Sequence, residues 1–454
     1  MGKLKMFDVN FDNCKGVYFA GEVVKGHVVL ELLEPMKIRV FTKVLLIKRI
    51  SGEPYLSSTG RNTSVRAYTS RAQLKLRLTC LGRAHVHWSE LENVGRRGGR
   101  QRLETVEYAA EEEYFKQKCS LWGKDLPVKV ELAVSLPITA LRLIEEVNPD
   151  ENDAIPAGKH TFPFELLLPA EVPSSFEGNY GYVRYWMKAT IDRPWKFDHH
   201  TKRAFTVIAD LDLAKEPRAA EPIHCQGEVN AGCWCCNCGG YSAVFCTNCR
   251  GCVPGEILLL YTEVENNTRW SNCSAEIRLK LVVTYYTERK TRQEKKVITR
   301  LKRDRLSIGN NEVWSDAFKI PPLPPSHLNG CKIITTQYIL QFIVETDGCN
   351  CDAIEFEKEL IIGTIPLRDG PPPMIPPVVP NEPPPKYTPH DHLKTAKLHQ
   401  RRLTPSAPPS YEECVFGRVN IKDKDDTDYT QGSLVFAPLY ACYDSEITPE
   451  DNVD

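Results

Sequence analysis

The sequence lacks the features that mark several classes of protein. It has no run of about 18 apolar residues, so we expect no membrane-spanning helix. It also lacks nucleotide-binding, metalloprotease and serine-hydrolase signatures (Gly-x-x-x-x-Gly-Lys-Ser/Thr, His-Glu-x-x-His and Gly-x-Ser-x-Gly), so we expect no enzyme. The net charge is −1, which gives the whole chain no field that favours nucleic acid or an anionic membrane.

Residues 1–7 lead directly into an alternating strand pattern, so we expect no secretory signal. The 17 cysteines are therefore expected to be reduced thiols or metal ligands and not a disulfide framework. A chain of 454 residues is long enough for two or three domains.

Strand patterns fill most of the first 367 residues. Apolar side chains alternate with other residues over 183–191, 277–285 and 338–344, as they do in strands with one buried face. Helical periodicity is weak throughout. Many short strands separated by proline and glycine indicate antiparallel sandwiches, so the predicted fold class is all-β.

Several local signals occur twice in the same order, which indicates an internal duplication. Gly21-Glu22-Val23 and Gly255-Glu256-Ile257 each open an apolar run. Pro173-Ser174 and Pro325-Ser326 each precede a later strand. We therefore predict two tandem sandwiches of one design.

The two copies differ in length. Gly21 and Phe164 are 143 positions apart, whereas the matching Gly255 and Phe318 are 63 apart. We assign the surplus in the first copy to insertions at 41–75 and 124–147. Surface insertions are tolerated because the entropy of loop closure grows slowly with length.

The composition changes after residue 367. Residues 370–411 hold 13 of the 33 prolines in the chain. Such a stretch cannot build a packed core, so we predict a disordered tail over 368–454.

Two copies of Pro-Pro-x-Tyr are the most informative motif of this tail. Adjacent prolines hold the backbone in the polyproline II conformation, and the tyrosine adds an amphipathic anchor at a fixed distance. A preformed ligand of this kind loses little entropy on an aromatic-lined groove, and this is how WW domains bind their targets. The predicted WW-binding residues are Pro384, Pro385, Tyr387, Pro408, Pro409 and Tyr411.

Seven multi-residue segments carry a resemblance to a known family. They are Gly158–Phe164, Pro173–Gly178, Val183–Trp186, Arg193–Trp195, Pro254–Glu256, Ile320–Pro322 and Ile361–Leu367. The first four resemble the N-terminal arrestin domain and the others the C-terminal one, so the chain resembles the α-arrestins. The resemblance implies an N-terminal arrestin domain over 5–210, a Cys-rich connection over 211–250 and a C-terminal arrestin domain over 251–367, both domains being immunoglobulin-like β-sandwiches.

The resemblance also implies a function. An α-arrestin is a cytoplasmic adaptor that is recruited to the plasma membrane and endosomes and binds transmembrane receptors or transporters as cargo. Its tail recruits HECT ubiquitin ligases of the Nedd family through their WW domains, which leads to ubiquitination, endocytosis and sorting of the cargo. The family often carries a further Pro-Pro-x-Tyr near its end. Here Ala437-Pro438-Leu439-Tyr440 lacks the first proline, so we expect only weak WW binding by Pro438 and Tyr440.

A function of another class is the alternative. The chain would then bind thioredoxin through a cysteine and act as a redox or metabolic regulator of nutrient uptake. A mixed disulfide with thioredoxin that depends on one cysteine would distinguish it from the adaptor.

The stretch 233–252 holds seven cysteines. Cys246 and Cys249 have the spacing of zinc ligands, and Cys235 with Cys238 could complete four thiolates. We favour a thiol-rich connection without metal; a structural zinc site is the first alternative and palmitoylation the second. No other cofactor is expected.

Basic residues offer two further contacts. The run Arg300–Arg305 is interpreted as a solvated loop, with a phosphate or lipid headgroup as the alternative ligand. The resemblance implies that Lys15 and Arg39 meet phosphorylated cargo.

Overall fold

The computed structural model describes residues 4–36, 42–46, 67–71, 75–97, 100–122, 154–193, 197–233, 236–269, 272–346, 353–367, 410–413 and 417–443. Over these residues the regular structure consists of strands and one short 3-10 helix, η3 (Leu213–Lys215). The predicted all-β class is therefore confirmed. No helix of the described part is long and apolar enough to cross a bilayer.

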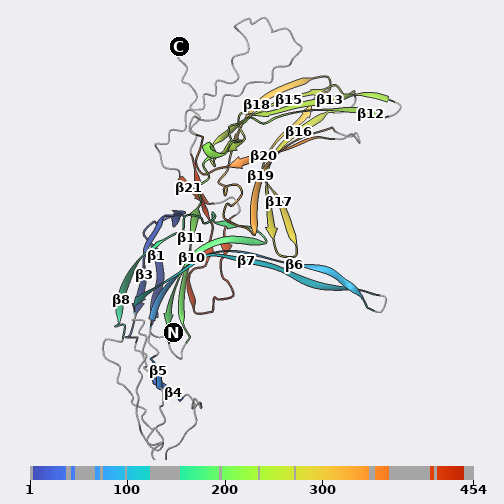
Figure 1. The fold of residues 1–454 in the computed structure, drawn as a ribbon. Helices are drawn as coiled ribbons and strands as arrows, with labels where there is room; N and C mark the ends of the chain where they lie inside the picture. Colours follow the sequence, from blue (N-terminus) through green and yellow to red (C-terminus); the bar gives the residue numbers. More distant parts are fainter. Residues whose placement is uncertain are drawn as a thin grey trace, which may run out of the picture.

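The first sandwich packs a three-stranded sheet against a larger one (Figure 1). The small sheet has the order β1 (Leu4–Phe11), β3 (Val23–Leu32), β8 (Gly158–Leu167). The large sheet has the order β2 (Val17–Phe19), β11 (His199–Ile208), β10 (Gly181–Asp192), β6 (Lys75–Arg97), β7 (Arg100–Trp122), with β9 (Phe176–Glu177) beside β10. Burial alternates along β10, as the pattern over 183–191 predicts.

The second sandwich repeats this arrangement. One sheet has the order β12 (His224–Cys233), β13 (Cys236–Thr247), β15 (Ile257–Asn266), β18 (Asn311–Lys319). The other has the order β14 (Gly251–Cys252), β20 (Ile354–Ile362), β19 (Ile334–Thr346), β16 (Cys273–Tyr286), β17 (Thr291–Leu306). The parallel pair β14–β20 matches the parallel pair β2–β11 of the first sandwich.

Side-chain hydrogen bonds confirm the duplication. In both sandwiches a glutamate accepts from the turn before a strand, a serine hydroxyl accepts from a strand of the large sheet, and a tyrosine hydroxyl donates to a proline carbonyl. The pairs are Phe19 N–H to Glu22 and Val253 N–H to Glu256, Val207 N–H to Ser175 and Ile362 N–H to Ser326, and Tyr185 O–H to Pro173 and Tyr338 O–H to Pro324. The same three side-chain hydrogen bonds therefore stabilise equivalent turns and strands in both sandwiches.

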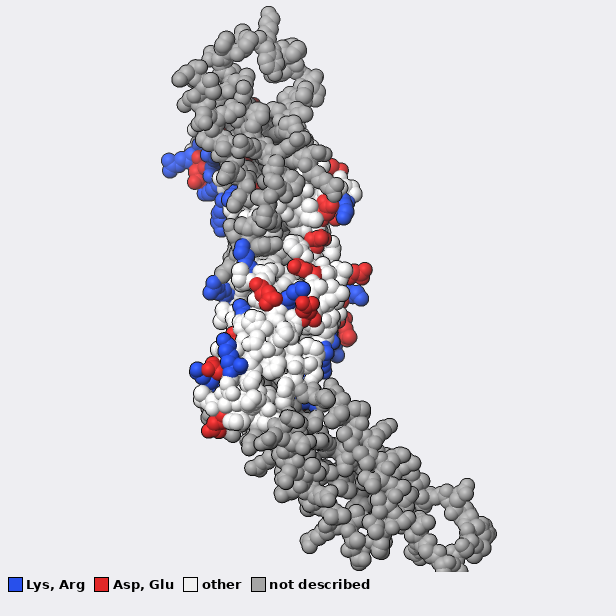
Figure 2. All heavy atoms as spheres, turned by 90° about the vertical axis from the view of Figure 1, so that its left-hand side faces the viewer, with Lys and Arg blue, Asp and Glu red and all other residues white. Residues whose placement is uncertain are grey.

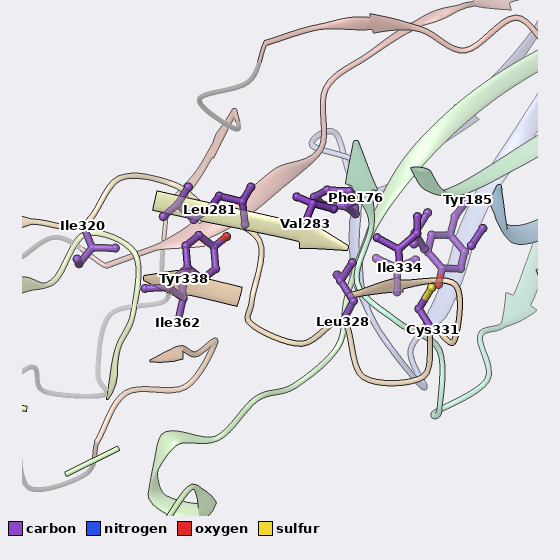
Figure 3. Packing of buried hydrophobic residues seen from close by; sticks show 14 of the residues in the cluster. Phe176, Tyr185, Leu281, Val283, Ile320, Leu328, Cys331, Ile334, Tyr338 and Ile362 are labelled. Carbon is purple, nitrogen blue, oxygen red and sulfur yellow. The ribbon is translucent and has the colours of Figure 1, made fainter. Parts of the chain in front are cut away.

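A continuous hydrophobic core runs through both sandwiches. Where they meet, Phe176 and Tyr185 of the first lie beside Leu328, Cys331 and Ile334 of the second (Figure 3). Apolar burial of this kind contributes roughly 25 cal/mol per Å². The junction is therefore part of the core, and the two sandwiches support one another.

The predicted Cys-rich connection over 211–250 is wrong. Residues 224–247 form the hairpin β12–β13, which begins the second sandwich. Tyr241, Ala243 and Phe245 point into the core at alternate positions, which is strand periodicity. Glycine and cysteine, which are poor strand signals, conceal it in the sequence.

Only part of the predicted insertions can be compared with the structure. Within 41–75 the structure describes β4 (Thr42–Leu46) and β5 (Ala67–Arg71), which pair with each other antiparallel. The segment 124–147 lies outside the described residues. Part of the surplus length of the first copy lies in β6 and β7, which have 23 residues each against 14 and 16 in β16 and β17.

The predicted disordered tail is wrong for residues 410–413 and 417–443. They contain the strands β21 (Ser410–Glu413), β22 (Val419–Asn420), β23 (Thr430–Ser433), β24 (Val435–Phe436) and β25 (Leu439–Cys442). This part of the tail folds because its carboxylates, aromatics and backbone find partners on the body, as described below. Residues 368–409 and 444–454 lie outside the described residues.

The repeated tyrosine anchors give a stability test. Tyr185→Phe and Tyr338→Phe each remove a hydroxyl that donates to a buried proline carbonyl, at 2.6 and 2.7 Å. Leaving a buried acceptor unsatisfied costs about 1–3 kcal/mol. Each variant should lower the free energy of unfolding, measured by urea denaturation, by about this amount. Tyr286→Phe, whose side chain is exposed, is the control and should change little. A loss in only one of the two anchors would contradict their equivalence.

Candidate functional site at the docked tail

The large sheet of the first sandwich carries cations on the face turned away from the core. Lys188 of β10 lies directly opposite Lys202 of β11, and Arg83 of β6 lies opposite Arg184 of β10. Like charges that face each other across strands destabilise a sheet. Arg184 has its own partner in Glu177, at 2.6 Å. Arg83 contacts Glu111 of β7 at 3.0 Å. Lys188 and Lys202 require carboxylates from elsewhere.

The tail supplies these carboxylates. Lys202 Nζ lies 2.8 Å from Asp423 Oδ2 and 2.9 Å from Asp426 Oδ2. Lys188 Nζ contacts Asp426 Oδ1 at 3.0 Å, and Arg83 Nη2 contacts Asp423 Oδ2 at 3.2 Å. We call these five residues the latch cluster. It joins three strands of the body to a segment more than 200 residues away in the sequence.

The latch cluster is buried. The side chains of Lys202 and Asp426 are 2% and 0% exposed. Burial alone would raise the pKa of Asp426, but hydrogen bonds from Lys202 and Lys188 outweigh it and lower this pKa to about 2. Lys202 also donates to the carbonyl of Ile421 and lies 4.6 Å from the ring centre of Trp186. Removing one partner from such a cluster leaves an uncompensated buried charge, which costs about 3–5 kcal/mol.

Backbone pairing adds to the ion pairs. β23 lies parallel to β11, with Thr430–Ser433 in register with His200–Arg203. Just before β23, the ring of Tyr429 stacks on Phe197 with centroids 5.2 Å apart. The tail thus binds the body by strand addition, a mode that peptides use on exposed sheet edges.

The end of the docked segment crosses to the second sandwich. Tyr440 is 2% exposed, and its hydroxyl donates to the carbonyl of Ser175 at 2.7 Å. Tyr443 donates its N–H to Pro254 O at 2.9 Å and its hydroxyl to Thr364 O at 2.7 Å. The predicted weak WW contact of Pro438 and Tyr440 does not fit this conformation, because both residues are buried in the docking interface.

Gly255 makes the last contact possible. Its φ of +88° lies in the left-handed region, which favours glycine. A Cβ at this position would lie 2.0 Å from the carbonyl oxygen of Tyr443. The turn before β15 is therefore also shaped to receive the tail.

The structure places only part of the two Pro-Pro-x-Tyr motifs. Tyr411 lies in β21, which pairs antiparallel with β25, and its partner in the register is Ala441. The other motif residues lie outside the described residues; they are Pro384, Pro385, Tyr387, Pro408 and Pro409. The second motif therefore ends at the docked segment.

Two members of the candidate zinc set are separated by the fold, and Cys235 lies outside the described residues. Cys238 and Cys246 lie on the same strand, β13, and at about 3.3 Å per residue their Cα atoms are roughly 26 Å apart. Thiolates that share one zinc ion lie within about 4 Å of each other, so this conformation does not bring Cys238 and Cys246 to one ion. Burial also raises the pKa of Cys246 to about 11. No cluster of metal-binding side chains occurs among the described residues.

A pocket of about 300 Å³ lies between the first sandwich and the docked tail. Lys15, Arg203 and Arg418 line it, and no carboxylate is among its lining residues. Arg203 also donates to Val9 O and Asn10 Oδ1, both at 3.0 Å. Arg39 lies outside the described residues.

Comparison with known proteins decides the family. The profile of "Arrestin (or S-antigen), N-terminal domain" matches residues 138–214, and that of "Arrestin (or S-antigen), C-terminal domain" matches residues 244–367. The chain belongs to the α-arrestins. The second match covers most of the second sandwich, and neither match covers residues 215–243.

Similar proteins include several arrestin-domain-containing proteins. This α-arrestin is 26% identical to Arrestin domain-containing protein 17 of Caenorhabditis elegans over 81% of its own chain and 72% of the relative. It is 27% identical to Arrestin domain-containing protein 4 of Mus musculus over 80% and 73% of the two chains. It is 24% identical to Arrestin domain-containing protein 1 of Rattus norvegicus over 85% and 72%.

The latch cluster was not among the predicted sites. A signal was present in the run 423–428, where four of six residues are aspartate. A second signal was the pair Lys188 and Lys202, which fall on the non-core positions of their strands. Only the strand register shows that these lysines face each other and need a common acid.

Removal of the latch carboxylates should release the tail. In Asp423→Asn/Asp426→Asn, Lys202 keeps its buried charge without an anionic partner. At about 3–5 kcal/mol, the amides of 421–433 should exchange with deuterium at least about 100-fold faster, as followed by mass spectrometry. Asp428→Asn, which changes an exposed residue of the same run, is the matched control. Unchanged protection in the double variant would show that the latch cluster does not hold the tail.

The latch should also open in acid. The pKa of Asp426 in the folded protein, about 2, is below the ordinary value of 3.8. Its contribution to docking is therefore complete above pH 3.8 and is lost as the pH falls through about 2. At pH 3.8 pepsin should cleave residues 417–443 more slowly in the wild type than in Asp426→Asn. The two cleavage rates should become equal as the pH falls to about 2. A constant ratio would contradict this.

Proposed function

We propose that this α-arrestin is a non-enzymatic adaptor. Its two sandwiches bind a transmembrane receptor or transporter, and its tail recruits a HECT ubiquitin ligase of the Nedd family through WW domains. The bound ligase then ubiquitinates the cargo, which is endocytosed and sorted. The adaptor works in the cytoplasm and is recruited to the plasma membrane and endosomes as a peripheral protein.

The proposal rests on where the two motifs lie in the chain. Two Pro-Pro-x-Tyr motifs occur between the end of the second sandwich, at Leu367, and the docked segment that begins at 417. The chain is fixed to the body on both sides of the motifs. A ligase that binds there is held close to whatever the sandwiches hold, which raises the effective concentration of ligase at the cargo.

The two motifs are not equivalent in this arrangement. Tyr411 belongs to β21, whose backbone pairs with β25. A WW domain that binds the second motif competes with this pairing. Tyr387 of the first motif is 24 positions earlier in the chain and is not part of β21. The first motif is therefore proposed as the primary contact. The second adds avidity when tandem WW domains bind both.

The pocket beside the docked tail supports one kind of cargo contact. Lys15, Arg203 and Arg418 line it, and an anionic group such as a phosphorylated side chain has the matching charge. The pocket is lined by both the first sandwich and the tail, so cargo and tail meet at one place.

The redox alternative has less support. Reactive cysteines have depressed pKa values and access to solvent. Cys225, Cys246 and Cys252 are buried, and their pKa values are raised, that of Cys246 to about 11. Cys14 is exposed to solvent. A mixed disulfide with thioredoxin at one of these positions would restore this alternative.

Binding to a tandem WW fragment of a Nedd-family ligase tests the proposal. Tyr387→Ala/Tyr411→Ala should abolish capture of the fragment, because the aromatic anchor is lost from both motifs. Either single variant should weaken capture by at least about 10-fold through lost avidity, and Tyr387→Ala should have the larger effect. Lys386→Ala/Ser410→Ala, which changes only the variable position of each motif, is the matched control. If the double tyrosine variant still captured the ligase, the proposed mechanism would be wrong.

A further inference from the structure

The pocket between the first sandwich and the docked tail carries charge of one sign on its walls. Its volume is about 300 Å³, its lining includes Lys15, Arg203 and Arg418, and no carboxylate is among the lining residues. We call it the basic pocket. On the face drawn in Figure 2, by contrast, cations and carboxylates are interspersed. A pocket of this size is at the lower end of the range for ligand sites and has room for a phosphate group.

Arg203 is the cation of the basic pocket with the best-defined position. Its Nη1 donates to Val9 O and to Asn10 Oδ1, both at 3.0 Å, and its guanidinium carbon lies 5.4 Å from the centre of the Phe11 ring. These partners hold the guanidinium in place, and all of them are neutral, so they leave its charge uncompensated. An arginine held in this way can donate its other N–H groups to an anion in the forked geometry that suits a phosphate.

The tail places a hydroxyl opposite this arginine. β23 runs parallel to β11, and Ser433 is the register partner of Arg203. Paired residues of neighbouring strands project to the same face of a sheet, and both of these residues line the basic pocket. Gly432 allows the close approach, because its φ is +100° and a Cβ there would lie 2.4 Å from the carbonyl oxygen of Lys202. The position of Ser433 in the pocket is therefore set by the backbone.

The hydroxyl of Ser433 contributes little to docking as it stands. The residue is exposed, and its Oγ donates to Val435 O at 3.3 Å, a long hydrogen bond within the tail. A phosphate ester at this oxygen would carry about −1.5 to −2 charges and three acceptor oxygens. A phosphate that matches the charge of the pocket can therefore come from a side chain that already lies in it.

We propose that Ser433 is a phosphorylation site and that its phosphate binds in the basic pocket, where it locks the docked tail onto the first sandwich. A protein kinase transfers the γ-phosphoryl group of ATP to Ser433 Oγ. The Oγ–P bond forms, the bond from the γ-phosphorus to the bridging oxygen breaks to release ADP, and the hydroxyl proton passes to the catalytic base of the kinase. The phosphate then adds charge-assisted hydrogen bonds from Arg203 to a segment that the latch cluster already holds.

This inference concerns the pocket that the proposed function assigns to an anionic group of the cargo, and it gives that pocket an occupant from the chain itself. The phosphorylated chain would keep its tail closed and exclude a phosphorylated cargo segment from the pocket. The lock requires neither ligase nor cargo. Failure of WW capture would overturn the proposed function and leave this inference intact, and a phosphate on Ser433 that stays in solvent would do the reverse.

The full chain with phosphoserine incorporated at position 433 tests whether the phosphate binds. The second pKa of a solvated phosphate ester is about 6. The cations of the pocket favour the doubly charged form, so this pKa, followed by phosphorus NMR, should fall by about one unit or more. The amides of 421–439 should exchange with deuterium about 10- to 100-fold more slowly than in the unmodified chain, which is the effect of one hydrogen-bonded charged group.

Phosphoserine in place of Gln431 is the matched control. Gln431 is exposed, lies on the same strand and does not line the basic pocket. Its phosphate should titrate near the ordinary value of about 6 and should not slow exchange. In Arg203→Gln, whose folding is checked by circular dichroism, phosphorylation of Ser433 should lose most of both effects, each measured against the unmodified Arg203→Gln chain.

Phosphopeptide mapping of the chain purified from eukaryotic cells, with and without phosphatase treatment, tests the modification itself and should find phosphate on Ser433. Absence of that phosphate would overturn the proposal. So would an ordinary phosphate pKa at position 433, or equal effects of phosphate at 431 and 433. Equal slowing of exchange by equimolar inorganic phosphate in the unmodified chain would assign the pocket to a diffusible anion and overturn the assignment to Ser433.

Discussion

The docked tail depends on the buried charge of Lys202. This residue lies on β11, opposite Lys188, and only 2% of its side chain is exposed. A lysine in that position stays charged only if acceptors replace the water it has lost. Asp423, Asp426 and the carbonyl of Ile421 are those acceptors, and all three come from the tail. The strand register of the body thus buries a lysine whose acceptors come from a distant segment, so the body and the tail form one structure.

Docking changes what the motif-bearing segment can do. A tail attached at one end would let the proposed ligase sample a wide volume, whereas a segment attached at Leu367 and again from 417 is a closed loop. Closure costs little for a long loop, because the entropy grows with the logarithm of its length. The docked segment also contacts both sandwiches, through Tyr440 at Ser175 and Tyr443 at Pro254. Displacement of the tail would therefore affect both sandwiches and the pocket between tail and body.

The sequence reveals what depends on local pattern and conceals what depends on register. The alternation in β10, β16 and β19 and the repeated Gly-Glu and Pro-Ser turns predict two sandwiches of one design, because each signal reflects burial or turn geometry within a few residues. β12–β13 was missed because cysteine and glycine carry little strand signal. The zinc set assumed a loop, whereas Cys238 and Cys246 lie far apart on one extended strand. The tail was misjudged because the prolines up to residue 409 dominate its composition, whereas the aspartates beyond them act through partners that only the fold brings near.

The latch cluster also differs from a surface ion pair in how it responds to solvent. Its acids belong to the same chain, lie within 3.2 Å of their cations and are largely removed from water, so the interaction resists screening by salt. Acid acts differently, because it removes the charge of Asp426 itself as the pH falls through the pKa of about 2 that this residue has in the folded protein. Docking of the tail is therefore expected to depend on pH in strong acid and to change little with salt.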